Sequence, residues 1–440
     1  MSGLPEGWAN CELSDVVEVL DAQRIPLNSG ERAARTEGKP ESALFPYYGA
    51  TGLVGYVDDY IFDEPLILLG EDGVPFLDLY RRKAYRISGK AWVNNHAHVL
   101  RPISWACDSR FIEAYLNCCD YAGHVTGTTR LKLTQAAMNR LPLPLAPLPE
   151  QKRIADKLDS VLARVDACRD RLDRIPALLK RFRQSVLAAA TSGRLTEDWS
   201  GARPADEWRA VSLGEVATGF SYGSAAKSAP DGLVPVLRMG NIQDGRVDWS
   251  DLVFTSNSEE IGKYRLVAGD VLFNRTNSPE LVGKTAVFKG EREAIYAGYL
   301  IRIRCTERLL PDYLNYCLGS PAGRDYCWRV KSDGVSQSNI NARKLAAFEF
   351  LLPTLAEQHE IVRRVETLFA FAGRLEARCA AARKQAGQLT PALLAKAFRG
   401  ELVPQDPADE PAAELLKRLA ARRAEAPKAR RGKPRASTGV

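Results

Sequence analysis

Two stretches of the chain repeat one pattern, LAPLPEQKRIADKLDSVLARV at residues 145–165 and LLPTLAEQHEIVRRVETLFAF at residues 351–371. Each runs from apolar residues through a proline to Glu-Gln, places Ile three residues after the Gln, and continues with helical spacing. Glu150 matches Glu357 at an offset of 207 residues, and no gap is needed between residues 148 and 195. Solenoid repeats have periods of about 20–50 residues, so a repeat this long indicates two similar modules instead.

A second pair of similar segments precedes each variable region. The segment EGWANCELSDV at residues 6–16 resembles DEWRAVSLGEV at residues 206–216 and places Leu13 opposite Leu213. We therefore interpret the chain as a duplicated unit of about 200 residues, in which a variable body precedes a similar tail. Such a chain can present two related faces, as a two-fold dimer does. The alternative is a duplication without functional symmetry.

Each tail is predicted to form a long helix with an apolar stripe. The stripe runs from Ile154 to Ala189 in the first tail and from Ile361 to Leu393 in the second, with the heptad spacing of a coiled coil. The two stripes are expected to pack antiparallel, although each helix could instead lie on its own domain. The residues predicted to pair the helices are Val161, Val165, Leu172, Leu179, Leu368, Leu375 and Leu389.

Proline and glycine predict where these helices are irregular. Pro176 and Pro391 fall inside the helical pattern, where a proline removes a backbone hydrogen bond, so we expect a kink or a restart at each. Thr390 followed by Pro391 resembles an N-cap and a first-turn proline. Gly193 and Gly400 stand where a left-handed glycine would end each helix.

The bodies of the two units read as mixed α/β. Short strand-like runs, such as LILLG at 66–70 and LIRIRC at 300–305, alternate with turns rich in Gly, Asn and Pro. We predict two α/β domains joined by two long antiparallel coiled-coil helices, with a pseudo-two-fold internal repeat. The predicted ranges are 1–145 and 201–350 for the α/β domains, 146–200 and 351–405 for the helical regions, and 406–440 for a C-terminal helix and basic disordered tail.

Polar turns in both bodies provide candidate DNA-binding residues. Arg pairs bidentately with guanine and Asn or Gln with adenine, while Ser, Thr and Lys contact phosphates. Taken singly, each group is also compatible with ordinary turn chemistry. The candidates are Tyr47, Tyr48, Thr51, Asn94, Asn95, His96, Thr128, Thr129, Arg130, Lys132, Arg238, Asn241, Asn274, Arg275, Ser336, Gln337 and Asn341.

Composition narrows the class of protein. The 440 residues are 45% hydrophobic and 26% charged, as in globular proteins, and the net charge of +7 is compatible with a polyanionic partner. No apolar run is long enough to cross a membrane, and the start of the chain lacks the pattern of a signal peptide. The nine cysteines form no CxxC pair. We therefore predict a cytoplasmic protein with reduced thiols and no membrane contact.

Catalytic and metal-binding motifs are not apparent. The segment LVGKTA at 281–286 contains Gly-Lys-Thr, but Ser278 stands where a P-loop has its first glycine. His96 and His98 with Cys118 and Cys119 match no zinc spacing, so we predict no metal site. The adjacent carboxylates in LLGEDG at 68–73 are interpreted as a polar turn. No nucleophile elbow or zincin motif occurs, which favours a binding protein.

Several segments together resemble the specificity subunits of type I restriction-modification enzymes. They include PYYGATGLVGYVDDYIFDEPLILLGEDG (46–73), LPLPLAPLPEQKRIADKLD (141–159), LRMGNIQDGRVDW (237–249), GVSQSNIN (334–341) and AFRGELVPQDPADEPAAELLKRL (397–419). Their order and duplication carry the resemblance, which covers nearly the whole chain.

The resemblance implies a non-catalytic DNA-specificity subunit. Each α/β domain would be a target recognition domain for one half of a bipartite site in double-stranded DNA, and the paired helices would set the spacing and dock two methyltransferase subunits. Restriction subunits would complete the complex. S-adenosylmethionine, Mg and ATP would bind in those partners and no cofactor in this chain. The alternatives are a stand-alone DNA methyltransferase with a recognition domain and a coiled-coil adaptor without a DNA role.

Overall fold

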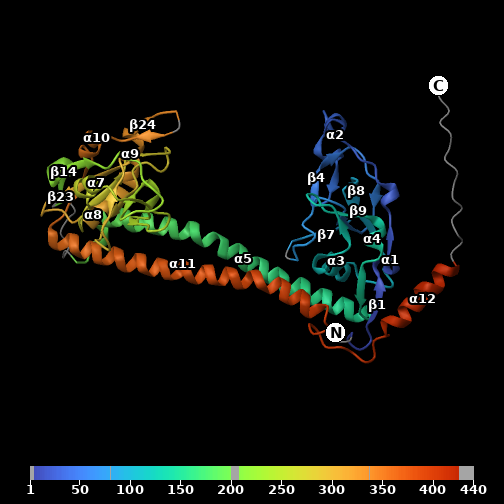
Figure 1. Ribbon diagram of the computed structural model, residues 1–440. Coiled ribbons are helices and arrows are strands. Elements are labelled where there is room, and N and C mark those ends of the chain that lie inside the picture. The colour runs from blue at the N-terminus through green and yellow to red at the C-terminus, as the bar shows by residue number, and fades with distance from the viewer. Residues whose placement is uncertain (1–3, 80, 200–207, 336, 426–440) are drawn as a thin grey trace, which may run out of the picture. The chain divides into compact units, whose positions relative to one another are not determined.

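The chain folds into two compact units, seen in a computed structural model that describes residues 4–79, 81–199, 208–335 and 337–425. The first unit comprises Met1–Leu172 with Ala382–Val440, and the second comprises Asp173–Ala381. Each unit holds one α/β module and part of each of two long helices (Figure 1). We call residues 4–145 module 1 and residues 208–352 module 2.

Module 1 contains two four-stranded sheets. The main sheet is antiparallel, with the order β2 (Val17–Val19), β9 (Ala97–Pro102), β6 (Leu66–Gly70) and β7 (Ala84–Ile87). The second has the order β4 (Gly52–Val57), β3 (Phe45–Gly49), β8 (Lys90–Val93) and β5 (Phe62–Asp63), with β3 and β8 parallel. Every residue of β6 is buried, because its apolar run LILLG lies between two neighbouring strands. The other elements are η1 (Asp21–Gln23), α2 (Ser29–Thr36), η2 (Glu41–Ala43), α3 (Ser109–Cys118), β10 (Val125–Thr126), β11 (Lys132–Leu133) and α4 (Gln135–Asn139).

Module 2 repeats this arrangement. Its main sheet has the order β14 (Ala217–Tyr222), β23 (Leu300–Cys305), β19 (Val271–Asn274) and β21 (Thr285–Val287). Its second sheet has the order β18 (Val253–Thr255), β15 (Val234–Leu237) and β22 (Ile295–Tyr296), with β15 and β22 parallel. The other elements are η5 (Met239–Asn241), β16 (Ile242–Gln243), β17 (Arg246–Val247), α7 (Ser258–Tyr264), β20 (Thr276–Asn277), α8 (Pro311–Gly319), α9 (Pro321–Val330), β24 (Ser332–Asp333), β25 (Ser338–Asn339) and α10 (Ala342–Ala346).

The two ends of each module pair with each other. In module 1, β1 (Ala9–Glu12) lies antiparallel to β12 (Pro142–Leu145), and in module 2, β13 (Arg209–Ser212) lies antiparallel to β26 (Glu349–Leu352). A one-turn helix follows each first strand, α1 (Leu13–Val16) and α6 (Leu213–Val216). The similar segments seen in the sequence are therefore the same structural element in the two modules.

The repeated glutamine joins each module to the start of a long helix. Gln151 and Gln358 are both fully buried. The side-chain oxygen of Gln151 accepts the backbone N–H of Asp108 at 2.9 Å, and that of Gln358 accepts the N–H of Leu310 at 2.8 Å. Asp108 and Leu310 are the N-cap residues of α3 and α8. A buried amide must find hydrogen-bond partners, so each glutamine fixes one short helix of its module against one long helix.

The repeated glutamate has a similar role. Glu357 is buried and accepts hydrogen bonds from Trp208 Nε1 at 3.0 Å and from Thr196 Oγ1 at 2.8 Å. Thr196 ends η3 (Arg194–Thr196), so this carboxylate ties the segment after one long helix to the start of the other within the second unit. The matching Glu150 is also buried, and burial raises its pKa.

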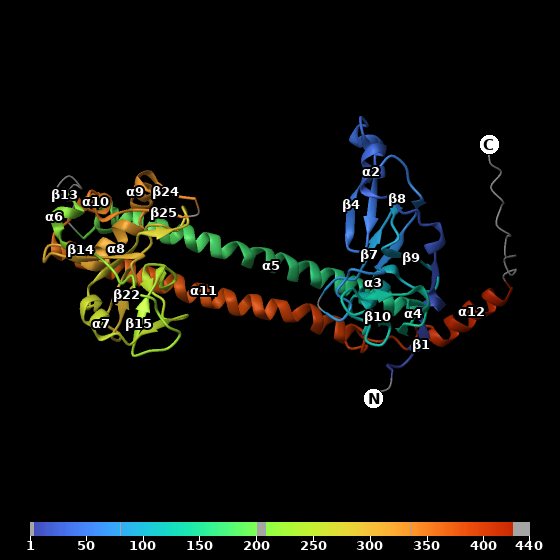
Figure 2. The same ribbon diagram turned by 45° about the horizontal axis from the view of Figure 1, so that its top comes forward.

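The two long helices, α5 (Leu148–Ala190) and α11 (Leu355–Ala397), lie side by side and antiparallel in each unit (Figures 1 and 2). In the first unit, Arg169 of α5 donates to the carbonyl oxygen of Ala386 at 2.9 Å, and Arg153 pairs with Asp409 beyond α11 at 2.6 Å. In the second unit, Arg183 pairs with Glu376 at 2.7 Å. The predicted antiparallel helix pair is confirmed. No helix among the described residues is long and apolar enough to cross a membrane.

Six of the seven predicted helix-pairing residues are buried or half-buried. Val165 and Leu179 are buried, whereas Val161, Leu172, Leu368 and Leu375 are half-buried. The prediction is wrong for Leu389, which is 47% exposed, because the buried stripe of α11 passes from Ala386 to Leu394 instead. An α-helix has 3.6 residues per turn, so a strict heptad stripe drifts around it.

The predictions for the prolines and glycines of the two long helices were partly correct. Both helices continue through their prolines without a restart, so the expected N-cap at Thr390 is wrong. Each proline removes one backbone hydrogen bond, and a helix of 43 residues keeps many others. Gly193 and Gly400 do adopt left-handed φ values of 81° and 70°, three residues after each helix.

The C-terminal segment completes the core of module 1. Helix α12 (Ala412–Glu425) lies beside β1 (Figure 2), and its Leu415 and Leu419 are buried in the same core as Trp8. The N–H of Ala412 donates to the carbonyl oxygen of Gly7 at 2.8 Å. The first and last parts of the chain therefore form one unit. The predicted basic tail at 428–440 lies outside the described residues.

Candidate functional site

Three polar loops of module 1 meet at one end of its main sheet. They are residues 70–73 after β6, residues 94–96 before β9, and residues 127–131 between β10 and β11. The N–H of Glu71 donates to the carbonyl oxygen of His96 at 2.8 Å, and the N–H of Leu133 donates to that of Glu71 at 2.8 Å. A β-bridge also joins Asp72 to Lys132. We call these segments the three-loop cluster of module 1.

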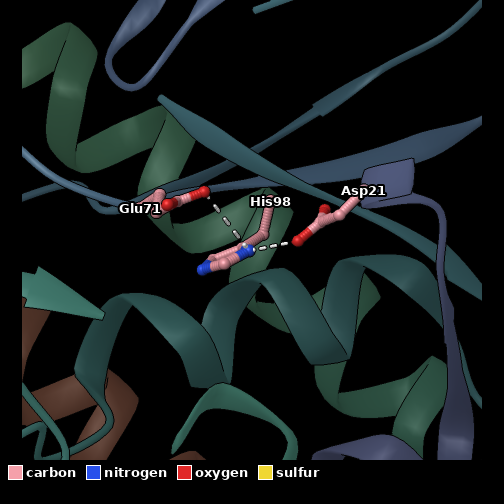
Figure 3. A group of neighbouring side chains, drawn as sticks. All are labelled: Asp21, Glu71 and His98. Carbon is pink, nitrogen blue, oxygen red and sulfur yellow. Dashed lines mark hydrogen bonds and ion pairs between the residues drawn. The ribbon is translucent and has the colours of Figure 1, made fainter. Parts of the chain in front are cut away.

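A buried group of charged side chains adjoins the three-loop cluster. His98 lies between Asp21 and Glu71 (Figure 3). Its Nδ1 contacts a carboxylate oxygen of Asp21, and its Nε2 lies 2.9 Å from the carbonyl oxygen of Leu133. The other oxygen of Asp21 accepts the N–H of Val99 at 2.8 Å. Both ring nitrogens of His98 therefore face oxygen atoms of the protein.

Two cations complete this group. Arg24 donates to Glu71 at 2.8 Å and to the carbonyl oxygen of Ala97 at 2.8 Å, while Lys132 lies 3.0 Å from the other oxygen of Glu71. Burial acts to raise the pKa of Glu71, but the hydrogen bonds from Arg24 and Lys132 outweigh it and leave the pKa below its ordinary value. The loops are therefore held by a nearly charge-balanced network.

This network is better explained as an anchor than as a metal site. Asp21, Glu71 and His98 lie close enough to offer three ligand atoms to a cation. Each of those atoms, however, already faces a donor or an acceptor of the protein. A metal would have to displace Arg24 and Lys132 from the carboxylate of Glu71 and break the contact between His98 and Asp21. We therefore infer that these three residues fix η1 to the main sheet.

Above the anchor, Asp72 holds two solvent-facing donors. Its carboxylate lies 2.6 Å from Nη2 of Arg130 and 3.0 Å from Nδ1 of His96. The side chains of Arg130 and His96 are 62% and 44% exposed, whereas that of Asp72 is 16% exposed. The polar-turn interpretation of LLGEDG therefore describes this loop. Asn95, Thr128 and Thr129, also predicted as DNA-binding residues, are exposed in the same cluster.

Module 2 has a cluster with the same backbone connections. The N–H of Arg275 donates to the carbonyl oxygen of Tyr299 at 3.0 Å, and the N–H of Ile340 donates to that of Arg275 at 2.9 Å. Arg275 thus occupies the position of Glu71, and Tyr299 that of His96. The guanidinium of Arg275 contacts Asn339 at 3.2 Å and stacks on the ring of Tyr222 at 4.8 Å. The scaffold is repeated, but its side chains differ.

Four predicted DNA-binding residues are instead buried inside their modules, and for these the prediction is wrong. Tyr47 is buried and its hydroxyl contacts the backbone of Leu27. Asn94 is buried and accepts the N–H of His96 at 2.8 Å. Asn241 is buried and donates to the carbonyl oxygens of Asp248 and Ser250, both at 3.0 Å, and Asn274 is fully buried. Buried amides and hydroxyls need internal partners, which removes them from the surface.

The remaining candidates are spread over both modules. Thr51 and Gln337 are exposed, Lys132 is exposed but paired to Glu71, and Tyr48 is half-buried beside Tyr85. Arg238 bonds to Asp251. Asn341 is exposed but caps α10. Ser336 lies outside the described residues.

The sequence analysis missed the residues that organise the clusters. Asp21, Arg24 and Asp72 in module 1, and Tyr222 and Tyr299 in module 2, were not predicted as site residues. Asp21 and Arg24 come from a segment about 50 residues before Glu71 and meet it only through the fold. The position of Asp72, directly after a buried strand and near two candidate loops, was the one usable signal.

The comparisons with known proteins agree on one family. A family model described as "Type I restriction modification DNA specificity domain" matches residues 5–177 and again residues 205–379. The chain is 38% identical over 303 residues to the EcoKI specificity subunit of Escherichia coli (strain K12), covering 66% of this chain and 65% of that protein. It is 37% identical over 303 residues to the StySPI specificity subunit of Salmonella potsdam, with the same coverage. These alignments span slightly under two thirds of both relatives.

A longer alignment and two solved structures extend the likeness. The EcoDI specificity subunit of Escherichia coli is 27% identical over 453 residues, covering 96% of each chain. The HsdS subunit from Thermoanaerobacter tengcongensis has a TM-score of 0.57 at 20% identity, covering 91% of this chain and 98% of that one. A chain from a study of the assembly and conformational transition of the type I R-M system has a TM-score of 0.61 at 18% identity, covering 91% of this chain and 100% of that one. At these identities, the structures establish the shared fold.

Proposed function

Because this chain belongs to the type I restriction-modification DNA specificity family, we propose that it is the sequence-specificity subunit of a type I restriction-modification complex. In this role the chain recognises a bipartite site in double-stranded DNA, with one half contacted by each module. The observation that carries the proposal is the duplicated family domain, built on one scaffold with different side chains at matching loop positions.

The loop clusters support recognition of separate half-sites. In module 1 the exposed donors of the cluster are His96, Arg130 and neighbouring polar residues, and in module 2 the matching positions hold Tyr299 and Gln337. Specific contacts to base edges come from side chains held in fixed positions by a rigid scaffold. Two scaffolds with different surface chemistry are suited to two different half-sites.

The helix pair is proposed to space the modules and to dock two methyltransferase subunits. α5 and α11 are uninterrupted over 43 residues each, and they are joined by a side chain–backbone hydrogen bond in the first unit and by an ion pair in the second. Restriction subunits would complete the complex. In this proposal S-adenosylmethionine, Mg and ATP bind in those partners, and this chain is not itself catalytic.

Methylation mapping tests this proposal against both alternatives. Adenine methylation is mapped at single-molecule resolution in host cells with and without the gene for this chain. The proposal predicts that a split methylation motif disappears on deletion and returns on complementation. A coiled-coil adaptor would leave the methylation pattern unchanged. A stand-alone methyltransferase would be revealed if the purified chain alone transferred methyl groups to DNA.

A further inference from the structure

We infer that Arg130 contacts a guanine in the half-site of module 1, that Asp72 positions Arg130 for this contact, and that His96 presents a second polar group beside it. The inference rests on the proposed function and names the residues and the base through which module 1 would act.

The first argument is the geometry of the two donors. Arg130 and His96 come from different loops and share one carboxylate, with contacts of 2.6 Å and 3.0 Å to the same oxygen of Asp72. Nδ1 of His96 is occupied by this contact, which leaves Nε2 for a ligand. Nη2 of Arg130 contacts Asp72, and a guanidinium retains further N–H donors on its other edge. Two exposed polar side chains are therefore held in a defined relation.

The second argument is the backbone beneath the arginine. Gly73 follows Asp72 with a left-handed φ of +70°, and a Cβ at Gly73 would lie 3.3 Å from Nη2 of Arg130. The guanidinium thus lies directly over this turn, where a side chain at residue 73 would crowd it. Glu71 and Lys132 pair on the opposite side of the same loops at 3.0 Å, which fixes the base of the turn.

The third argument is electrostatic. A guanidinium in contact with a carboxylate is nearly neutral as a pair, and the carboxylate repels a nearby phosphate. The pair therefore gains little electrostatic attraction from the phosphates of the DNA backbone. The carboxylate does hold one edge of the guanidinium, and the remaining N–H donors match the O6 and N7 acceptors of guanine in the major groove. A base contact consequently fits Arg130 better than a phosphate contact.

Module 2 provides an internal comparison. By the shared backbone bonds, Thr276 follows Arg275 as Asp72 follows Glu71, and Tyr299 occupies the position of His96. The repeat offset of 207 residues places Gln337 opposite Arg130. Module 2 therefore lacks this carboxylate–arginine pair among its described residues, and substitutions in module 1 should leave the other half-site unchanged.

The test replaces single residues of the chromosomal gene and maps the methylation motif again. Arg130→Ala removes the proposed reader, Asp72→Asn removes the positioning charge, and Arg140→Ala is the matched control, because Arg140 is an exposed arginine of the same module. Chain abundance is measured by immunoblot for each variant, and affinity for a wild-type site is measured at several salt concentrations with the purified complex.

We expect Arg130→Ala to reduce the preference for guanine at one position of one half-site roughly 5- to 150-fold, as loss of a bidentate base contact does. Asp72→Asn should reduce the preference for guanine at the same position, but by less. A general loss of stability would not produce a change confined to one position. Arg140→Ala should leave the motif unchanged.

Three outcomes would overturn the inference. One is an unchanged motif in Arg130→Ala at normal abundance, and another is a change in the half-site of module 2. The third is a uniform loss of affinity with the motif retained and a salt slope reduced by about one, which identifies a phosphate contact. In all three cases the wild-type chain still specifies a split motif, so the proposed function stands. Absence of any split motif in the wild type would refute the proposed function instead.

Discussion

The buried glutamines offer a sharp test of how the modules are attached to the long helices. Replacing Gln358 by Leu keeps the approximate volume but removes three hydrogen bonds, from the N–H of Leu310 at 2.8 Å and to the carbonyl oxygens of Arg308 at 2.9 Å and Pro353 at 3.0 Å. A buried polar group left without a partner costs about 1–3 kcal/mol. At about 1–3 kcal/mol for each of the three partner groups, we expect a loss of about 3–9 kcal/mol in the free energy of unfolding of the second unit.

The assay combines chemical denaturation with hydrogen exchange followed by mass spectrometry. The substitution should raise exchange at the start of α8, where the N–H of Leu310 loses its acceptor. Gln151→Leu should do the same at the start of α3 in the first unit. His359→Leu and Lys152→Leu are matched controls, since both residues are exposed and neighbour the glutamines, and each should change stability by less than about 0.5 kcal/mol.

A loss below about 1 kcal/mol for Gln358→Leu would refute the reasoning, because it would mean that the three partner groups find water or other partners. Equal increases of exchange in both units would also contradict it, since the hydrogen-bond partners of each glutamine among the described residues lie in its own unit.

Three further predictions concern the same scaffold. Replacing Leu415 and Leu419 by Ala should destabilise the first unit by about 2–5 kcal/mol per residue, because both are buried in the core of module 1, and thermal unfolding monitored by hydrogen exchange should show no effect on module 2. Trp208→Phe should cost about 1.5–3 kcal/mol, because it removes the 3.0 Å hydrogen bond to the buried carboxylate of Glu357, and denaturation with urea measures it. The pKa of Glu71 is lower in the folded chain than its ordinary value, so its ionised form stabilises the fold above pH of about 4.3, and this stability is lost as the pH falls through the folded pKa. Unfolding curves between pH 7 and pH 3 should therefore show a smaller acid destabilisation of the first unit in Glu71→Gln than in the wild type.

The sequence was sufficient to predict the architecture because the repeat carries it. The Glu-Gln pairs mark the start of each long helix, and the apolar stripe between Ile154 and Ala189 predicts a helix pair. The errors arose where a rule about a single residue competes with the packing of a long helix. Pro176 and Pro391 do not end their helices, because packing along many turns outweighs one missing hydrogen bond. Leu389 is exposed because the heptad pattern ignores the drift of a real helix.

The candidate site was predicted only at the level of loops. Polar composition located the segments around residues 94–96 and 127–132, which the fold brings together. It could not separate Asn94, which is buried, from Asn95, which is exposed, because that distinction depends on contacts made by distant strands. Asp72 was missed as a site residue for the same reason, since its role comes from His96 and Arg130, 24 and 58 residues away.

The most direct test of the central claim is an exchange of one module. Residues 205–350 are replaced by the corresponding segment of a family member that specifies a different split sequence, and adenine methylation is mapped in cells that carry the chimera. We predict that one half of the methylated motif changes to that of the donor, while the other half and the spacer remain. A chimera that is present at normal abundance but changes both halves, or neither, would contradict the assignment of one half-site to each module.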